Sequence, residues 1–336
     1  MTASTYLGQM FPDADLPHVR LGGAPTPVRR AELPDLEVDL WVKDDGAFGD
    51  GGWAGNKVRK LEWIIPEAHR RGADTLFTVG GIGTHWGLAA ALYGREHGLR
   101  TVLGLVDQPV DDHVREQLAR LQDSGAIVSR HASVRRLKLA APAIMARCVW
   151  RSRGTLPYYL PAGGSSPVGA LGYVDAGLEI AAQVKAGVMP APDTVVSAVG
   201  SGGTAAGLAV GLRLGGLDAR VLGVVVNDSF RLDATTIAQL ARETAALLRQ
   251  RGADVDVQIT PDDLTADARW LGVTYGATTP ESTDAAAWAA PLGLSLEPVY
   301  TAKALAALRQ MRPEQGRHVL FLGTHGPKNR GASRMG

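Results

Sequence analysis

A lysine in the first sixty residues has the surroundings of a reactive amine. Lys57 lies in the run Gly55-Asn56-Lys57-Val58-Arg59-Lys60-Leu61-Glu62, which follows a glycine-rich stretch. Asn56 is a good helix N-cap, so we expect Lys57 in the first helical turn. The positive helix end, with Arg59 and Lys60, favours the neutral form of the amine. A neutral amine of this kind can attack a carbonyl group. The alternative interpretation of the run is a basic helix start that is exposed to solvent and has no chemical role.

A second motif has the pattern of a phosphate-binding loop. The run Gly200-Ser201-Gly202-Gly203-Thr204-Ala205-Ala206-Gly207 follows an apolar strand and opens a helix. Residues without a β-carbon let backbone N–H groups approach an anion, and Ser201 and Thr204 add hydroxyls. A reactive lysine combined with such a loop indicates an enzyme that holds a phosphorylated aldehyde, such as pyridoxal 5'-phosphate (PLP).

The same loop also satisfies G-x-G-x-x-A, the dinucleotide fingerprint. A dinucleotide site needs an acidic residue at the end of the next strand, about 20 residues on. Here the next strand ends late, at Val226-Asn227-Asp228. A nicotinamide-dependent oxidoreductase is therefore the first alternative, and a packing turn that binds no ligand is the second.

Two further segments place polar groups at the ends of apolar runs. Gly80-Gly81-Ile82-Gly83-Thr84-His85-Trp86-Gly87 lies between a predicted strand and a predicted helix, where backbone N–H groups suit a substrate carboxylate. Thr84 and His85 could add a donor or move a proton. Near the C-terminal end, Tyr300 is a candidate general acid or base, and Thr324 could bond a ring nitrogen. Without the other motifs, each would be an ordinary turn residue.

The composition favours a globular enzyme with a small-molecule substrate. The chain has 336 residues, of which 45% are hydrophobic, and its net charge of +1 comes from 35 basic and 34 acidic side chains. This balance predicts no nucleic-acid partner and no attraction to a membrane surface. No run approaches the roughly 20 apolar residues of a membrane span, and we predict a cytoplasmic protein. The single cysteine, Cys148, is expected in the core, and we predict no metal site.

Apolar runs that alternate with amphipathic segments predict an α/β protein with open, mostly parallel twisted sheets flanked by helices. Candidate strands are Leu76–Val79, Thr101–Leu105, Ala126–Ser129, Leu156–Leu160, Thr194–Val199, Val221–Val226 and His318–Leu322. Candidate helices include Gly87–His97, Asp112–Gln122, Val134–Ser152, Val168–Lys185 and Ala234–Arg249. The glycine- and proline-rich run Pro161–Pro167 suggests that the chain passes there from one domain to the other. The segment Asp254–Thr283 lacks periodicity and is expected to be a loop near the active site.

These motifs, in this order, resemble the fold type II PLP enzymes of the tryptophan-synthase-β superfamily. Within it, the chain is similar to the family of 1-aminocyclopropane-1-carboxylate deaminases and D-cysteine desulfhydrases, from about Val42 to Gly326. Besides the runs quoted above, the segments Pro161–Ser165, Gly169–Gly172 and Pro298–Lys303 carry the resemblance. The resemblance implies a homodimer and two domains. Residues 1–59 and 166–336 would form a large PLP-binding domain, and residues 60–165 a small one.

The resemblance also implies a role for each matching residue. Lys57 would form the Schiff base with PLP, Asn56 would shape its bend, and Gly200 to Thr204 would hold the phosphate. Thr84 would contact substrate and move protons. The cofactor would lie near Tyr300, with Tyr275 across the pocket and Thr324 at the pyridine nitrogen.

The chain also departs from the family pattern. Gly83-Thr84-His85 replaces Gln-Ser-Asn, so His85 would replace the asparagine that donates to the phenolic oxygen of PLP. Trp86 would reshape the substrate pocket, and there is an insertion at Asp50–Ala54.

The residue types favour β-elimination from a small amino acid, giving a 2-oxo acid and ammonia. In cyclopropane deaminases a glutamate follows the signature tyrosine, whereas this chain has Thr301 there. A threonine near the ring nitrogen makes a milder electron sink, which favours a substrate with a good leaving group, such as D-cysteine. The alternatives are a 1-aminocyclopropane-1-carboxylate deaminase, a specialised biosynthetic enzyme with an unusual amino-acid substrate, and a relative that binds PLP without turnover.

Overall fold

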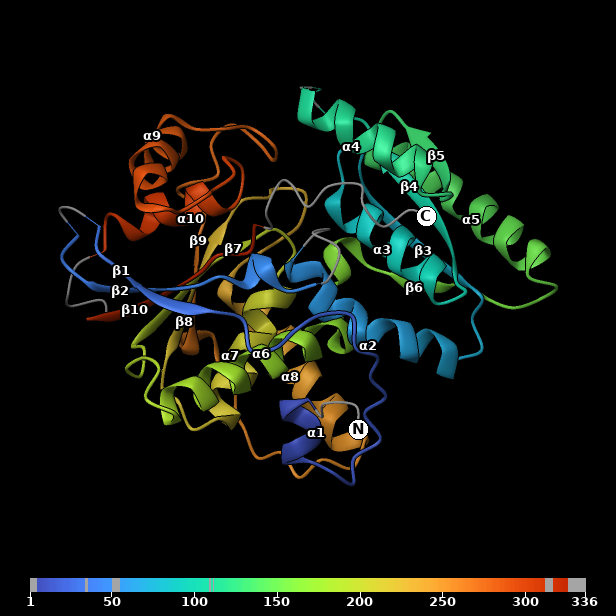
Figure 1. Cartoon of the computed structure of the whole chain (residues 1–336). Helices are drawn as coiled ribbons and strands as arrows, with labels where there is room; N and C mark the ends of the chain where they lie inside the picture. Colours follow the sequence, from blue (N-terminus) through green and yellow to red (C-terminus); the bar gives the residue numbers. More distant parts are fainter. Residues whose placement is uncertain are drawn as a thin grey trace, which may run out of the picture.

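The computed structural model describes residues 5–33, 36–49, 55–108, 110, 112–311 and 317–325. It is an α/β structure with two mostly parallel sheets flanked by helices, as the sequence predicts (Figure 1). The described strands are β1 (Val28–Ala31), β2 (Asp39–Lys43), β3 (Thr75–Gly81), β4 (Arg100–Val106), β5 (Ile127–His131), β6 (Tyr158–Leu160), β7 (Thr194–Val199), β8 (Arg220–Val225), β9 (Leu264–Asp267) and β10 (His318–Leu322). The insertion at Asp50–Ala54 and the C-terminal Gly326 lie outside the described residues.

Helices separate almost all of these strands along the chain. The described α-helices are α1 (Tyr6–Met10), α2 (Asn56–Arg70), α3 (His85–Glu96), α4 (Asp112–Asp123), α5 (Val134–Arg151), α6 (Pro167–Lys185), α7 (Gly203–Leu214), α8 (Ala234–Gln250), α9 (Pro280–Ala289) and α10 (Thr301–Leu308). Short 3-10 turns are η1 (Asp45–Ala47), η2 (Ala162–Gly164), η3 (Pro261–Asp263) and η4 (Ala290–Leu292). None of the helices in the described part of the chain is long and apolar enough to span a membrane.

The larger sheet has the strand order β1-β2-β10-β7-β8-β9, and the smaller has the order β5-β4-β3-β6. Only β1 pairs antiparallel, with β2, while the other described pairs in both sheets are parallel. Helices α9 and α10 pack on one face of the larger sheet, and α6, α7 and α8 cover the other (Figure 1). In the smaller sheet, α3 and α4 pack on one face and α5 on the other.

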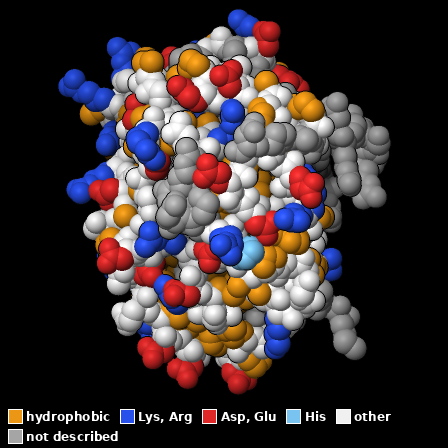
Figure 2. Space-filling model, turned by 90° about the vertical axis from the view of Figure 1, so that its left-hand side faces the viewer, with side chains coloured by type: hydrophobic (Ala, Val, Ile, Leu, Met, Phe, Trp, Pro, Cys, Tyr) orange, Lys and Arg blue, Asp and Glu red, His pale blue; other side chains and the backbone are white. Residues whose placement is uncertain are grey.

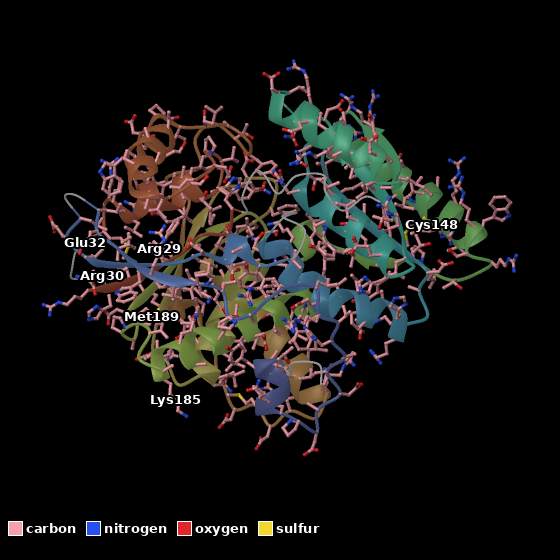
Figure 3. The ribbon with its side chains drawn as sticks, viewed as in Figure 1. Arg29, Arg30, Glu32, Cys148, Lys185 and Met189 are labelled. Carbon is pink, nitrogen blue, oxygen red and sulfur yellow. The ribbon has the colours of Figure 1, made fainter. Side chains whose placement is uncertain are left out.

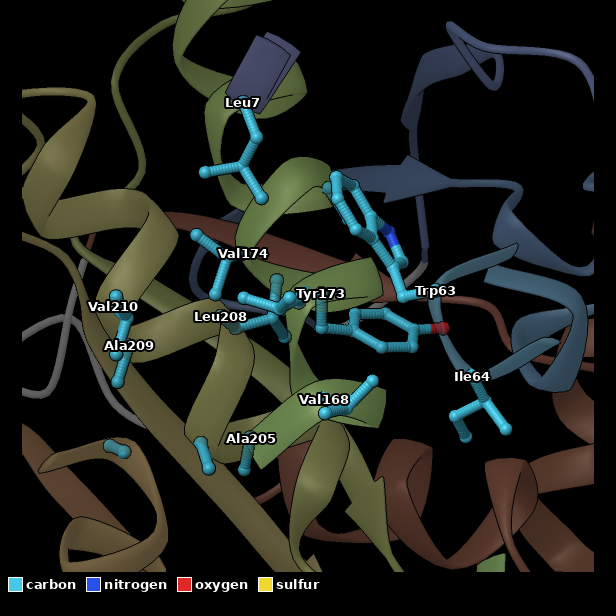
Figure 4. Close-up of a cluster of buried hydrophobic side chains, with 14 of the residues drawn as sticks. Leu7, Trp63, Ile64, Val168, Tyr173, Val174, Ala205, Leu208, Ala209 and Val210 are labelled. Carbon is cyan, nitrogen blue, oxygen red and sulfur yellow. The ribbon is translucent and has the colours of Figure 1, made fainter. Parts of the chain in front are cut away.

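The main core joins α2 to the larger sheet through α6 and α7. Trp63 of α2 packs in the same cluster as Tyr173 of α6 and Leu208 of α7 (Figure 4). Two glycines let these helices approach closely. A β-carbon on Gly172 would lie 2.1 Å from the Arg59 carbonyl oxygen, and one on Gly207 would lie 2.3 Å from a carbonyl oxygen of α6. The start of α2 is thus held against the helix layer that also carries the start of α7.

Most predicted elements are confirmed, with two corrections. The predicted loop Asp254–Thr283 contains β9, a short parallel strand at the edge of the larger sheet. The edge strand β1 and its neighbour β2 were not predicted, because neither forms a long apolar run. The proposed division of the chain at residue 59 falls inside the continuous helix α2, and the domain boundaries stay a prediction. Cys148, a residue of α5, is buried against the smaller sheet, as expected (Figure 3).

Candidate active site

The candidate residues gather where parallel strands end. In open α/β sheets, ligands bind beyond the carboxyl ends of the strands, where the connecting loops meet. Thr84 ends the loop after β3 and His85 opens α3, while the loop after β7 carries Gly200. Tyr275 follows β9, and Thr324 follows β10. The loops after β6 and β7 touch, because the Ser165 and Ser201 hydroxyl oxygens lie 2.8 Å apart, so the two sheets contribute to one site.

Lys57 lies in the first turn of α2, as predicted, but the cap differs. The N-cap is Gly55, with a positive φ of 27°. A β-carbon on it would lie 2.7 Å from the Cα of Gly46, so this bend requires glycine. Asn56 is the buried first helical residue and caps nothing with its side chain, which corrects the predicted N-cap. Burial lowers the pKa of Lys57 to about 8, against an opposing effect of the Glu297 carboxylate.

Arg59 does not lower the pKa of Lys57, in contrast to the sequence-based expectation. Its guanidinium turns to the far side of α2 and forms ion pairs with Asp45, at 2.7 Å, and with Glu179, at 3.1 Å. Lys43 also bonds Glu179, and Tyr173 donates to Asp45 at 2.6 Å. The two cations and two carboxylates balance one another in a buried cluster. This cluster ties the start of α2 to β2 and α6 and so fixes the position of Lys57.

Lys60 is a second buried lysine of the site, and the sequence analysis gave it no binding role. It lies three residues after Lys57, on the same side of the helix, and donates from Nζ to the Gly163 carbonyl oxygen at 2.9 Å. Burial, followed by the charge of Lys57, lowers the pKa of Lys60 well below its usual range. The i, i+3 spacing of two lysines before an apolar helix was the available signal. An anion beside Gly163 would restore the charge of Lys60.

The Gly200 loop has the form of an anion cradle. Gly202 is the N-cap of α7 with φ 88°, a conformation that favours glycine. The Gly203 N–H donates to Ser165 Oγ at 2.9 Å, and a β-carbon on Gly203 would lie 2.7 Å from that oxygen. Thr204 is buried in the first turn. The loop therefore offers backbone donors, serine hydroxyls and the positive end of α7, with glycines where a side chain would block access.

The structure also bears on the dinucleotide alternative. The residue after β8 that reaches the loop is Asn227, whose amide donates to the Gly200 carbonyl oxygen at 2.9 Å. The next residue, Asp228, turns away and accepts from the Thr274 hydroxyl and the Tyr275 backbone N–H. No carboxylate contact to the Gly200 loop is found among the described residues, so the acidic group that a ribose requires is not supplied here.

Tyr300, which the sequence analysis expected near the cofactor, and Tyr275, which it expected across the pocket, are in direct contact. Their hydroxyl oxygens lie 2.6 Å apart, and their rings meet edge to face with centroids 6.1 Å apart. The Tyr300 ring packs on the loop, since a β-carbon on Gly200 would lie 2.8 Å from its Cε1. Burial raises the pKa of Tyr275 and raises that of Tyr300 well above 10. Both phenols therefore keep their protons at neutral pH.

A carboxylate and a lysine that the sequence analysis missed support this pair. Glu297 accepts backbone N–H bonds from Val299, Tyr300 and Thr301 at the start of α10. Lys303, on the same helix, donates to the Leu271 carbonyl oxygen at 2.6 Å in the segment that leads to Tyr275. An acidic residue followed by proline, just before a helix, was the available signal for Glu297.

The helix after β3 begins at His85, two residues before the predicted start at Gly87, and Trp86 has a different position from the expected one. Thr84 is the N-cap of α3 and accepts the Gly87 N–H at 3.1 Å. His85 lies in the first turn, with Nδ1 3.3 Å from the Gln117 amide of α4. Trp86 is only 3% exposed and donates to the Thr78 hydroxyl at 2.8 Å. Its indole is thus a core side chain rather than a wall of the substrate pocket.

The two threonines proposed near a ring nitrogen have different environments. Thr301 is buried, and its hydroxyl accepts the Glu297 N–H at 3.0 Å as part of the helix start. Thr324 is half-buried after β10, beside Gly323, whose backbone bonds Lys43 and Gly46. The hydroxyl of Thr301 is therefore engaged in the backbone of α10, and Thr324 stays the candidate.

The comparisons with known proteins identify the family. The family model for pyridoxal-phosphate dependent enzymes matches residues 19–324. The chain belongs to this family of PLP-dependent enzymes. It is therefore an enzyme, and PLP is its cofactor. This assignment leaves the nicotinamide alternative without support.

Individual relatives cover nearly the whole chain. A protein of Pyrococcus abyssi, provisionally named a 1-aminocyclopropane-1-carboxylate deaminase, is 33% identical over 300 residues, 87% of this chain and 86% of that protein. The D-cysteine desulfhydrase of Salmonella paratyphi A is 31% identical over 331 residues, 92% of this chain and 94% of the relative. The crystal structure of a 1-aminocyclopropane-1-carboxylate deaminase homologue has a TM-score of 0.77 at 29% identity and covers 95% of this chain and 94% of its own.

The residues of the site fit PLP. Schiff-base formation with the PLP aldehyde requires an amine that is partly neutral near pH 8. Lys57 is such an amine, because its pKa is lowered to about 8. A phosphate requires backbone N–H groups, hydroxyls and a cation, and the Gly200 loop, Ser165 and Lys60 offer these together. No group of His, Cys, Asp and Glu side chains in the described residues could hold a metal ion.

Proposed function

We propose that the enzyme catalyses β-elimination on a small amino acid, in the manner of a D-cysteine desulfhydrase. The observation that carries this proposal is a buried lysine amine whose pKa is lowered to about 8 and which shares its site with an anion-binding loop and a protonated tyrosine pair. Relatives named D-cysteine desulfhydrase over more than nine-tenths of the chain support this choice of reaction.

The geometry supports a set of cofactor-binding residues. Lys57 binds the aldehyde of PLP, and Asn56 completes the bend before it. The phosphate would be held at the N-terminal end of α7 by Gly200, Ser201, Gly202, Gly203 and Thr204. Lys60, whose Nζ donates to the Gly163 carbonyl oxygen, would donate to the phosphate when PLP is bound, and the charge of the phosphate would favour the ammonium form of Lys60. We assign His85 to the phenolic oxygen and Thr324 to the pyridine nitrogen.

The catalytic roles follow from the protonation states. Bound PLP supplies an electron sink for the carbanion at the substrate α-carbon. The neutral amine of Lys57 removes the α-proton, because Tyr275 and Tyr300 keep their own protons at neutral pH. Their hydroxyls donate hydrogen bonds to the departing β-substituent, and Thr84 holds the substrate carboxylate at the start of α3.

The atoms of the reaction balance with water as the only co-reactant. In the reaction with D-cysteine, the carbon–sulfur bond breaks, and the sulfur leaves with the bonding electron pair as hydrosulfide, which takes up a proton. Water then hydrolyses the released enamine. The products are pyruvate, ammonia and hydrogen sulfide.

A 1-aminocyclopropane-1-carboxylate deaminase is the second candidate. The relative from Pyrococcus abyssi and the similar crystal structure favour it. The side chain after Tyr300 argues against it. Opening of a cyclopropane has no α-proton to remove and so demands a strong electron sink, whereas Thr301 carries no charge and is engaged with Glu297.

Product analysis distinguishes the two candidates. Purified enzyme with PLP is incubated separately with D-cysteine, L-cysteine and 1-aminocyclopropane-1-carboxylate, and sulfide, 2-oxo acid and ammonia are assayed. We expect sulfide and pyruvate from D-cysteine, with no product from a Lys57→Ala variant and unchanged rates from Lys185→Ala, an exposed control on α6. A 2-oxo acid from the cyclopropane substrate alone would favour the second candidate, and no product from any of the three would reject both.

The family resemblance further supports a homodimer in the cytoplasm. Light scattering during size-exclusion chromatography measures the mass in solution, and we expect twice the 35.4 kDa of one chain. Charged side chains of both signs are interspersed on the face shown in Figure 2, in keeping with small-molecule rather than nucleic-acid partners. Fractionation of the source cells would test the location.

A further inference from the structure

A cavity lies between α5 and the smaller sheet, apart from the candidate active site. It has a volume of about 360 Å³, and its lining includes Thr75, Arg100 and Ile127, the first residues of β3, β4 and β5. These strands are parallel, so their first residues share one edge of the sheet. The candidate active site follows the other end of β3, a strand of seven residues that spans roughly 20 Å. The cavity is therefore a separate site.

The side chains of α5 explain why this space stays open. Near the start of the helix, Leu137 packs on Gly104 of β4, where a β-carbon would lie 2.5 Å from Leu137 Cδ1. Farther along the helix, Cys148 is buried in one cluster with Val102 of β4. Between these two contacts the helix presents Ala140 to the cavity. An alanine side chain is too short to fill the space beside the sheet, so the helix is anchored at two points with a gap between them.

The walls of the cavity are largely apolar. Val102 and Ile144 line it from the sheet and from α5. Ile127 and Val128 of β5 also line it, and they are 37% and 36% exposed, so their side chains stay in contact with water unless something covers them. An apolar cavity of about 150 Å³ holds one benzene, so a volume of about 360 Å³ has room for a ring with a short chain.

The charged side chains at the cavity all have the same sign. Arg147 and Arg151, four residues apart on α5, line it together with Arg100 of β4, and none of the described residues that line it is acidic. Arg100 is paired with Asp74 at 2.7 Å. Arg147 and Arg151 form no ion pair with any residue in the described part of the chain. The sequence contains no Asp or Glu at positions 130–174, so α5 supplies no counter-charge of its own. A negative group in the cavity would be attracted to both guanidinium groups.

We propose that this cavity binds a small organic anion in which a carboxylate is joined to an apolar body. The carboxylate would bind Arg147 and Arg151, whose planar guanidinium groups suit it. The apolar body would cover the side chains of Val102 and Val128. An inorganic anion would leave this apolar wall in contact with water, and an uncharged hydrocarbon would leave the two guanidinium groups without an anion. The site lies outside the proposed reaction, and binding there does not depend on that reaction.

Cys148 makes occupancy of the cavity measurable. It is the only cysteine of the chain and lines the cavity, so a bound ligand should protect its thiol from N-ethylmaleimide. PLP-loaded enzyme is labelled at constant ionic strength with increasing 4-phenylbutyrate, and the labelling rate is followed by mass spectrometry. We expect a saturable decrease in this rate, and no decrease with 4-phenylbutyramide, which has the same apolar body without the charge. Calorimetric titration with the two compounds measures binding without use of the thiol.

Two variants of α5 test the role of charge. Arg151→Gln removes a guanidinium group of the cavity and keeps a polar side chain, so it should weaken the binding of 4-phenylbutyrate about tenfold. Arg135→Gln is the same change at an exposed position of α5 outside the cavity and should leave the affinity unchanged. Burial raises the pKa of the Cys148 thiol, and the charges of Arg100 and Arg151 oppose this effect. For this reason affinities, and not labelling rates, are compared between variants.

A third variant tests the space itself. Ala140→Leu fills part of the cavity and leaves every charge in place, so 4-phenylbutyrate binding should become too weak to measure. Thermal melting and the absorbance of bound PLP confirm that the variant is folded, and Ala143→Leu takes its place if it is not.

Three results would overturn the proposal. The first is equal binding of the acid and the amide, and the second is no heat of binding with the acid at all. The third is an affinity that neither Arg151→Gln nor Ala140→Leu changes, which would mean that the acid binds elsewhere, for example at the catalytic site.

Discussion

The protonation state of Lys57 is the property on which the proposed chemistry most depends. Burial lowers its pKa from 10.5 to about 8. At pH 7 roughly a tenth of the amine is then neutral, against about one part in three thousand for an ordinary lysine, a difference of roughly 300-fold. Since only the neutral amine attacks an aldehyde or removes a proton, this fraction sets the rate at which the site can be loaded.

Competitive acetylation of the cofactor-free enzyme measures this fraction directly. The labelling rate of the Lys57 peptide is followed from pH 6 to 11 relative to Lys185, an exposed lysine at the end of α6 (Figure 3). Restricted access of the reagent to Lys57 slows its labelling by the same factor at every pH and so does not move the midpoint. We expect a midpoint near 8 for Lys57. A midpoint above 10 would refute the claim that the folded chain prepares this amine for reaction.

Three further predictions concern the groups around it. Glu179→Gln leaves the buried cluster with uncompensated positive charge and should lower the free energy of unfolding by about 3 kcal/mol at pH 7 in urea titrations. Burial raises the pKa of Glu179, but its cationic partners outweigh burial and hold it below 4.5. Folding therefore favours the ionised form, and stability should fall as the pH drops below about 4.5, a dependence that Glu179→Gln should weaken. Gly203→Ala places a β-carbon 2.7 Å from Ser165 Oγ. We expect this variant to bind PLP about tenfold more weakly in an absorbance titration. Unchanged binding would argue against a phosphate site at this loop. Tyr275→Phe removes a group that raises the pKa of Tyr300, so the ultraviolet titration of Tyr300 should move to lower pH, and a shift to higher pH would contradict the pairing.

The sequence predicts the parallel strands of both sheets well, because buried parallel strands are continuous apolar runs. Thr194–Val199 and His318–Leu322 were predicted with the bounds that β7 and β10 have. The strand β1, with the sequence Val-Arg-Arg-Ala, pairs on one side only and carries two charged residues, so it lacks that signal. The short strand β9, at the other edge of the sheet, was also missed, because it lies in a segment without a hydrophobic periodicity.

The glycine loops and the reactive lysine could be found from sequence, since their chemistry is local. The direction of Arg59 could not, because its partner Glu179 lies 120 positions away along the chain. The same holds for Lys60, whose acceptor at Gly163 is 103 positions away. Trp86 was placed in the pocket from its neighbours in the motif, whereas burial against the loop after β6 decides its position.

Reduction of the cofactor-loaded enzyme with borohydride tests the central claim most directly. The reagent fixes PLP to the amine that holds it, and peptide mass mapping then locates the adduct. We expect a single adduct on the peptide that carries Lys57, and none in a Lys57→Ala variant. An adduct on Lys60 or on another lysine, or no adduct at all, would contradict the assignment of Lys57 as the cofactor-binding residue.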